Sequence, residues 1–190
     1  LREKSGVDTF EEPKKKEKSN KNNLNFNGKE MLYELTGTDL AEIFGITETN
    51  AIEIISEVGL DMSKWPTVKH FTSWLNLAPN NKISGGKVLS SRIPKKKNHA
   101  GQIFRMAAFA IQRSKNWLAM FYNRIKAKNG APKAIVATAR KIAAIFYKMV
   151  KERVKFNPIP IEKYMDGFKE NQIKKLKRQA KNLGLQIVEM

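Results

Sequence analysis

Apolar residues recur at helical spacing along most of the second half of the chain. A helix that begins at Pro132 is predicted, because apolar positions there follow a period of about 3.6 residues. These positions are Ile135, Ala139, Ile142, Phe146, Met149 and Val150. Asn98 is a suitable cap for a second helical stretch that reaches about Lys128, with a break near 114–116. The predicted buried side of this stretch consists of Ile103, Phe104, Ala107, Ala108 and Ile111.

A last helix, from about Ile161 to Leu183, ends before Gly184. Earlier in the chain, Pro66 suits the first position of a helix that runs to about Leu75 and buries Phe71, Trp74 and Leu75. Between residues 78 and 97, prolines and glycines interrupt every helical period. The pattern therefore predicts a mainly α fold, a helical bundle with a long Gly-rich basic loop that contains short extended pieces.

The segment before Met62 predicts two short helices. Thr38 is a candidate cap for a helix over 39–44, and Thr47 for a helix over 48–58. Gly45-Ile46-Thr47 between them resembles the turn of a helix-hairpin-helix, whose amides contact DNA phosphates. Plain packing of these helices against a core is the alternative.

These patterns divide the chain into four segments. Residues 1–29, rich in Lys, Glu, Asn and Ser, predict a disordered linker. Residues 30–61 hold the acidic, helix-hairpin-helix-like element, residues 62–156 a basic domain, and residues 157–190 a C-terminal basic helix and tail.

Positive charge is concentrated in the basic domain. The chain holds 36 Lys and Arg against 18 Asp and Glu, a net charge of +18. From Met62 to Lys151 there are 19 Lys and Arg and no acidic residue, so this segment accounts for the whole surplus. Such a surplus attracts polyanions: DNA, RNA, the ribosome or an anionic membrane surface. No apolar run approaches the roughly 20 residues that span a bilayer, so we expect a cytoplasmic, nucleoid-associated protein without a membrane partner.

The residue types present restrict the chemistry. The chain has no Cys and only two His, which excludes disulfides, thiolate zinc sites and a His-rich metal site. A two-metal nuclease needs several converging carboxylates, and the basic segment has none, so we expect no metal site and no cofactor within this chain. Tyr122 and Tyr147 lie beside apolar residues on helices, which favours a core position over a role as nucleophile.

The loop from Asn80 to Asn98 has the composition of a phosphate-binding segment. Gly85 and Gly86 allow close approach of the backbone to a phosphate, and cations surround them: Lys87, Arg92, Lys95, Lys96 and Lys97. Ser84 directly precedes the glycines, where its hydroxyl is placed to attack a phosphodiester. The alternative is that Ser84 only caps the turn.

The pattern F-x-S-W-L-x-L-x-P-x-x-x-x-S-G-G-K, from Phe71 to Lys87, is followed by S-R-I-x-K-x-x-N and by a helix that carries Arg105. Together with G-A-P-K-A at 130–134, it resembles the C-terminal domain of insertion-sequence transposases of the one-hundred-and-ten type. The resemblance covers about residues 32–187. It implies a DNA recombinase whose serine, Ser84, becomes joined to duplex DNA. Phosphate contacts are then expected from the loop cations and glycines, Asn98 and Arg105.

The same resemblance implies a homo-oligomer in the full-length protein and a guide RNA as a further partner. Two details depart from the family. Ile83 stands where many members have a second hydroxyl, and Lys96-Lys97-Asn98 lacks the glycine of the usual K-R-G-N. Members also begin with a RuvC-like domain that carries four metal-binding carboxylates, and none precedes Lys29 in this chain. We therefore expect a transposase that is incomplete by itself.

Two other classes of function remain open. One is a catalytically inactive nucleic-acid-binding protein, either a transposase remnant or a ribosome-associated factor. The other is an assembly module in which the helix over 135–150 pairs with a partner chain.

Overall fold

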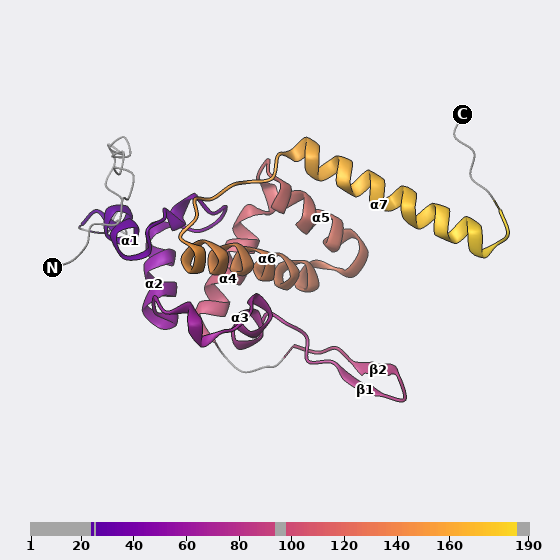
Figure 1. Cartoon of the computed structure of the whole chain (residues 1–190), viewed down its shortest axis with the longest axis horizontal. Coiled ribbons are helices and arrows are strands. Elements are labelled where there is room, and N and C mark those ends of the chain that lie inside the picture. The colour runs from indigo at the N-terminus through magenta and orange to yellow at the C-terminus, as the bar shows by residue number, and fades with distance from the viewer. Residues whose placement is uncertain (1–23, 25, 94–97, 186–190) are drawn as a thin grey trace.

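The computed structural model describes residues 24, 26–93 and 98–185, and within these ranges the fold is mainly α, as predicted (Figure 1). The α-helices and strands are α1 (Gly28–Thr36), α2 (Glu48–Val58), α3 (Val68–Trp74), β1 (Lys82–Ser84), β2 (Lys87–Ser90), α4 (His99–Ala110), α5 (Trp117–Asn129), α6 (Ala131–Glu152) and α7 (Ile161–Asn182). Three short 3-10 helices connect them: η1 (Leu40–Glu42), η2 (Met62–Lys64) and η3 (Ile111–Arg113). No helix in the described ranges is long and apolar enough to cross a membrane.

Helix α6 is the centre of the body. It packs against α4 and α5 over most of its length and also contacts α3. Of the apolar positions predicted for its buried side, Ile135 is half-buried and the others are buried, because the about 3.6-residue period places them all on the side that faces these helices. The chain's own helices thus cover this apolar side, so it offers no surface for pairing with a partner chain.

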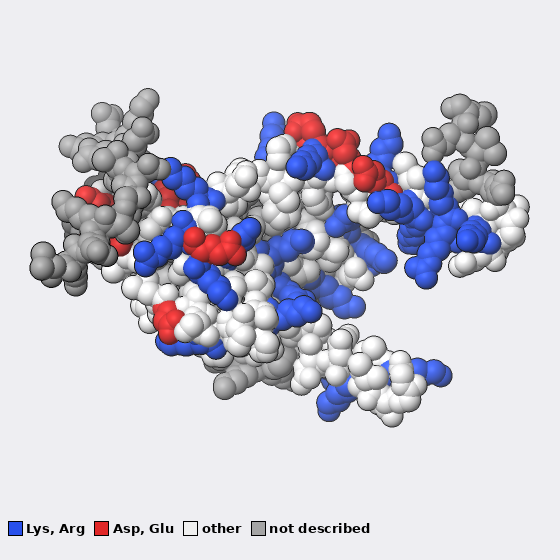
Figure 2. All heavy atoms as spheres, in the orientation of Figure 1, with Lys and Arg blue, Asp and Glu red and all other residues white. Residues whose placement is uncertain are grey.

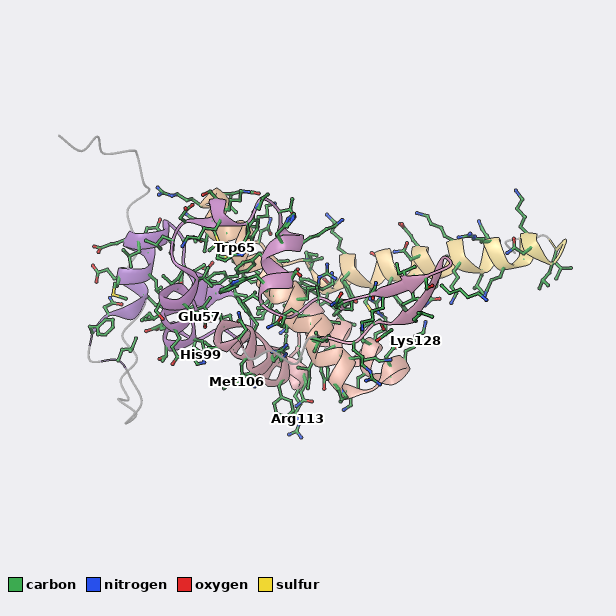
Figure 3. The ribbon with its side chains drawn as sticks, turned by 90° about the horizontal axis from the view of Figure 1, so that it is seen from below. Glu57, Trp65, His99, Met106, Arg113 and Lys128 are labelled. Carbon is green, nitrogen blue, oxygen red and sulfur yellow. The ribbon has the colours of Figure 1, made fainter. Side chains whose placement is uncertain are left out.

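Helix α4 confirms the predicted cap and the predicted buried side. Asn98 caps it by accepting a hydrogen bond from the amide of Gly101 at 2.7 Å, and Ile103, Phe104, Ala107, Ala108 and Ile111 are buried. Glu57 of α2 accepts a further hydrogen bond from the amide of Ala100 at 2.5 Å, so a carboxylate lies at the positive end of the α4 dipole. Figure 3 shows Glu57 and His99 close together where α2 meets the start of α4.

The buried tyrosines and the surrounding rings hold three helices together. Tyr122 and Tyr147 are buried, as predicted. The Phe71 ring of α3 contacts the Tyr147 ring of α6 at 5.4 Å and the Phe104 ring of α4 at 6.5 Å between centroids. The Tyr147 hydroxyl donates to the carbonyl oxygen of Trp65 at 2.7 Å. This cluster holds α3 against the body, and the segment that leads to β1 begins at the end of α3.

Several predictions for the first half of the chain are wrong in detail. Helix α3 begins at Val68 after Thr67, and not at Pro66. Trp74 is 40% exposed and lies beside the Trp65 ring, at 5.1 Å between centroids, instead of in the core. A 3-10 turn, η1, replaces the helix predicted over 39–44, because Asp39 caps it and the Thr38 hydroxyl instead donates to the carbonyl oxygen of Val154.

The disorder predicted for 1–29 is wrong for Gly28 and Lys29, which open α1. Residues 1–23 and 25 lie outside the described residues. Asn27 caps this helix, because its Oδ1 accepts a hydrogen bond from the amide of Glu30, and Asn27 Nδ2 also donates to Glu30 Oε2.

The turn between η1 and α2 is packed against α4. Thr47 caps α2 as predicted, and Gly45 has a φ of +84°. A Cβ atom on Gly45 would lie 2.6 Å from the carbonyl oxygen of Ala107 and 2.7 Å from Ile111 Cγ2. The absence of a side chain at Gly45 therefore allows close packing of the turn on α4, which favours the packing interpretation of the Gly45-Ile46-Thr47 sequence.

Helix α7 is attached to the body only near its start, and none of its residues is fully buried. The Tyr164 ring lies 5.8 Å from the Trp117 ring of α5, and the Phe168 ring lies 4.8 Å from the Arg124 guanidinium. Beyond Phe168 the helix extends away from the body, toward the same end as the β1–β2 hairpin (Figures 1 and 3).

The close packing at Gly45 generates a testable prediction. We expect Gly45→Ala to lower the free energy of unfolding by about 1–3 kcal/mol more than Gly59→Ala, measured by urea denaturation. Gly59 is a matched control because its φ is +82° but a Cβ there would meet only Lys64 Nζ, at 3.4 Å. Equal losses for the two variants would show that backbone strain alone, and not packing on α4, requires glycine at 45.

Candidate nucleic-acid interface

The loop predicted between residues 78 and 97 contains an antiparallel hairpin, β1–β2. Its two-residue turn is Gly85-Gly86, with φ values of +54° and +74°. Positive φ at both central residues is what a type I′ turn requires, and this turn matches the natural twist of paired strands. A Cβ on either glycine would meet nothing within 4 Å. The turn is therefore open to the approach of a ligand.

The strand register gives the tip two different faces. Ser84 pairs with Lys87, and Ile83 pairs with Val88. Because neighbouring residues of a strand point to opposite faces, Ser84 and Lys87 share one face, while Ile83 and Val88 share the other. A bulge between Lys82 and Ile83 lies at the next step toward the body. The predicted nucleophile and a cation thus lie side by side on the polar face of an exposed tip.

The base of the hairpin is anchored tightly to α3 and α4. Asn98 Nδ2 donates to the carbonyl oxygen of Trp74 at 3.3 Å, and Gly101 packs so closely on the carbonyl of Leu75 that a Cβ could not fit. Arg105 Nη2 donates to the carbonyl oxygen of Asn76 at 2.7 Å, and Asn76 has a φ of +55°. Partial burial lowers the pKa of Arg105 from its ordinary value. These contacts hold together the two ends of the segment 76–98, which leaves the body after α3 and returns to it at the start of α4.

The structure separates the predicted site residues into three groups. Ser84, Gly85, Gly86, Lys87 and Arg92 lie together on the exposed hairpin or at its foot. Asn98 and Arg105 lie at its base, where their polar atoms bond to the backbone, so their contacts with DNA stay a prediction. Lys95, Lys96 and Lys97 lie outside the described residues. Among the residues described, no hydrogen bond joins Ser84 Oγ to another side chain.

Basic residues gather around the hairpin and on α7. Figure 2 shows Lys and Arg on the body between the hairpin and α7 and along the distal part of α7, while acidic residues lie over α1, α2 and the first turns of α7. Lys126 and Lys128 are in the last turn of α5. The distal cations of α7 are Lys174, Lys175, Lys177 and Arg178, which the sequence predicted as a basic helix but not as part of this surface.

A groove of about 550 Å³ lies between the foot of the hairpin and α6. Leu77, Pro79 and Ile93 line it on the hairpin side, and Val136, Arg140 and Lys141 line it on the α6 side. The groove thus has an apolar floor and a basic rim at the foot of the hairpin. Local sequence patterns do not predict this groove, because the hairpin wall and the α6 wall, such as Ile93 and Val136, are more than 40 residues apart in the chain.

Two cations of this region rest on aromatic rings. Lys141 Nζ lies 4.9 Å from the centre of the Phe121 ring and 5.6 Å from that of Trp117. Desolvation against these rings, together with the nearby Arg124 guanidinium, lowers the pKa of Lys141. Arg124 in turn lies 5.6 Å from the centre of the Tyr164 ring, and desolvation raises the pKa of Tyr164. Cation–π contacts therefore connect the groove to the start of α7.

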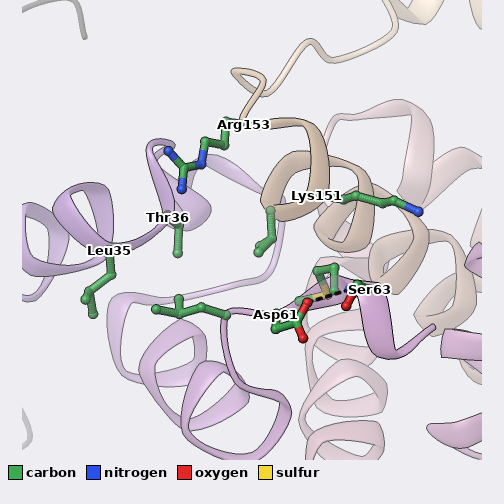
Figure 4. A pocket seen from close by; sticks show the side chains of 9 residues that line it. Leu35, Thr36, Asp61, Ser63, Lys151 and Arg153 are labelled. Atoms are coloured by element: carbon green, nitrogen blue, oxygen red, sulfur yellow. Dashed lines mark hydrogen bonds between the residues drawn. The ribbon is translucent and has the colours of Figure 1, made fainter. Parts of the chain in front are cut away.

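A separate cavity of about 360 Å³ lies at the other side of the body, among Leu35, Ser63, Val150 and Arg153 (Figure 4). Its carboxylate, Asp61, accepts a hydrogen bond from the amide of Ser63. Hydrogen bonding with the Ser63 side chain, and then with this amide, lowers the pKa of Asp61. That hydrogen bond caps η2, so the carboxylate serves the local fold. Among the described residues, no group of three or more His, Asp or Glu is placed to hold a metal ion.

Comparison with known families matches residues 37–123 to the family described as Transposase IS116/IS110/IS902 family. The matched segment begins before η1 and ends within α5, so it includes the hairpin and both of its anchoring helices. No curated protein matches the chain.

The hydrogen bond at the hairpin base predicts a difference between two arginines. We expect Arg105→Met to lower the free energy of unfolding by about 1.5–3 kcal/mol, because the variant loses a charge-assisted hydrogen bond to Asn76. The matched variant Arg92→Met should leave stability within about 0.5 kcal/mol of the wild type, since Arg92 is exposed. Urea denaturation of both variants measures this. Equal stability of the two would show that the contact with Asn76 does not anchor the hairpin.

Proposed function

We propose that this chain binds duplex DNA and joins its strands through the hydroxyl of Ser84, because residues 37–123 match the model of the transposase IS116/IS110/IS902 family. The family implies DNA transposition and binding of DNA. The serine nucleophile goes beyond the family match, and it is supported by the geometry of the hairpin tip.

One observation carries the proposal: Ser84 and Lys87 are cross-strand neighbours at the tip of an exposed hairpin, next to two glycines without side chains. A phosphodiester can approach this tip without steric obstruction. Lys87 would then bring a cation to the phosphate that Ser84 faces, and Arg92 adds a second exposed cation near the foot. A serine that only capped the turn would need neither the exposure nor the neighbouring charge.

In the proposed step, Ser84 Oγ forms a bond to phosphorus and one bridging P–O bond of the DNA breaks. The serine proton passes to solvent, and the departing DNA oxygen takes a proton from solvent. Extra negative charge develops on the phosphoryl oxygens in the transition state, where Lys87 stabilises it. A later attack by a DNA hydroxyl on the same phosphorus releases Ser84 and completes strand joining.

The rest of the basic surface supplies affinity. Cations between the hairpin and α7 neutralise phosphates and release the counterions that DNA holds. The proposal includes a guide RNA and a homo-oligomer of the full-length protein as the resemblance implies, and the distal cations of α7 offer a surface for a second nucleic-acid strand.

The nucleophile is tested by trapping a covalent adduct. We expect the purified chain, incubated with labelled insertion-sequence end DNA, to give a DNA adduct that survives denaturation and disappears on protease treatment. Ser84→Ala should abolish the adduct, while Ser91→Ala, which removes another exposed hydroxyl nearby, should retain it. An absent adduct with intact binding in all three proteins would instead favour a catalytically inactive nucleic-acid-binding protein.

The electrostatic part of the proposal predicts a steep dependence on salt. A chain that neutralises roughly 6–10 phosphates should lose about 10³–10⁵ in affinity for duplex DNA between about 50 and 200 mM salt, measured by fluorescence anisotropy. Lys87→Gln should reduce the slope of log K against log salt by about 1. Lys29→Gln, on α1 and ion-paired with Asp39 at 3.6 Å, should leave the slope unchanged. A flat response of the wild type contradicts the proposed binding surface.

A further inference from the structure

We propose that the β1–β2 hairpin is a wedge that enters between the two strands of an opened duplex and lays its apolar face, Ile83 and Val88, against an exposed base pair. This inference rests on the proposed function and adds to it: it states which part of the DNA each face of the hairpin contacts. Ser84 and Lys87, on the opposite face, would then meet the sugar–phosphate backbone of the displaced strand.

The apolar face is the first observation. Ile83 is 63% exposed and Val88 is 57% exposed, and the register places them directly opposite each other. Apolar side chains that gather on a projecting element, without cover from the rest of the described chain, mark a contact surface. A hairpin that only bound phosphates would carry polar side chains at these positions.

The separation of charge between the faces is the second observation. Lys87 pairs with Ser84 and so lies on the face opposite Ile83 and Val88. The tip therefore fits a partner that is flat and apolar on one side and anionic on the other. At the junction of an opened duplex, the last base pair presents an apolar face and the displaced strand presents phosphates, so the junction has both surfaces.

A second copy of the chain fits this face less well. Two or three side chains at a tip bury at most a few hundred Å², and a stable protein interface needs about 1,200 Å² or more. The segment from Met62 to Lys151 also contains no acidic residue, so two copies that met at their hairpins would bring basic segments of like charge together. Nucleic acid instead complements the charge of the whole segment.

The anchored base is the third observation. Insertion of side chains between stacked bases costs free energy, which contacts at the tip must offset. The hairpin can make these contacts only if its base is held firmly against the body. Asn98 and Arg105 bond to the backbone of residues 74 and 76 at the two ends of the segment that carries the hairpin. The hairpin thus has an anchored foot and an exposed tip.

The wedge is tested with forked DNA whose paired bases include 2-aminopurine at the first position next to the fork. Fluorescence of this base rises when it loses stacking on its neighbour. We expect the full chain to raise it on saturation and to bind the fork at least about fivefold more tightly than a blunt duplex of equal length. The double variant Ile83→Ser, Val88→Ser should lose both effects while it keeps its salt-sensitive binding to the blunt duplex, because its cations are unchanged.

Controls separate the wedge from the nucleophile. Ser84→Ala should keep the fluorescence change, since its hydroxyl lies on the other face. Leu60→Ser, which removes an exposed apolar side chain far from the hairpin, should behave as the wild type. Circular dichroism melts confirm that each variant is folded, which we expect because neither Ile83 nor Val88 belongs to the core.

Four results would overturn the wedge. Saturating binding of the wild type without a fluorescence change would leave the proposed DNA binding intact and remove only the wedge. Equal fork preference in the double variant would show that the apolar face plays no part. A change in sedimentation of the DNA-free chain on Ile83→Ser, Val88→Ser would show that the face contacts another protein copy. Failure to bind either DNA would reject the proposed function as well.

Discussion

The site depends on the contacts that hold together the two ends of the segment that carries the hairpin. Residues 76–98 leave the body at the end of α3 and return at the start of α4. The contacts of Asn98 with Trp74 and of Gly101 with Leu75 hold these two points together. A two-stranded hairpin alone is marginally stable in water, so its geometry here depends on this anchoring. The tip can remain exposed and polar on one face because its position is determined elsewhere.

The anchoring depends in turn on the aromatic cluster beneath it. Phe71, Phe104 and Tyr147 bring α3, α4 and α6 into contact, and they are all buried. None of these side chains reaches the exposed surface around Ser84. The residues that stabilise the fold therefore differ from those proposed to contact DNA. Arg105 lies between the two sets, since its side chain is half-buried and bonded to the backbone of Asn76.

The sequence was sufficient to predict features that depend on neighbouring residues. Caps at Thr47 and Asn98 and the buried side of α6 follow from local side-chain chemistry and helical period, and each was confirmed. The Asn27-x-x-Glu30 spacing is a local signal for the start of α1, and the Gly85-Gly86 pair is a local signal for the hairpin turn.

Other features could not be predicted from neighbouring residues alone. Thr38 fails as a cap because its hydroxyl bonds to Val154, more than 100 residues away. The packing of Gly45 on α4 and the groove beside α6 likewise require distant segments to meet. For the candidate site, the sequence placed Ser84 next to its cations and glycines, but the register that separates a polar from an apolar face came only from the structure.

The way in which α7 is attached has a consequence for how this protein can change during evolution. Only its first turns touch the body, through Tyr164 and Phe168, and no residue of the helix is fully buried. Insertion or deletion of residues beyond Phe168 would alter the reach of the helix by about 1.5 Å per residue without disturbing the core. Relatives can therefore differ in the length of this arm while they share one body.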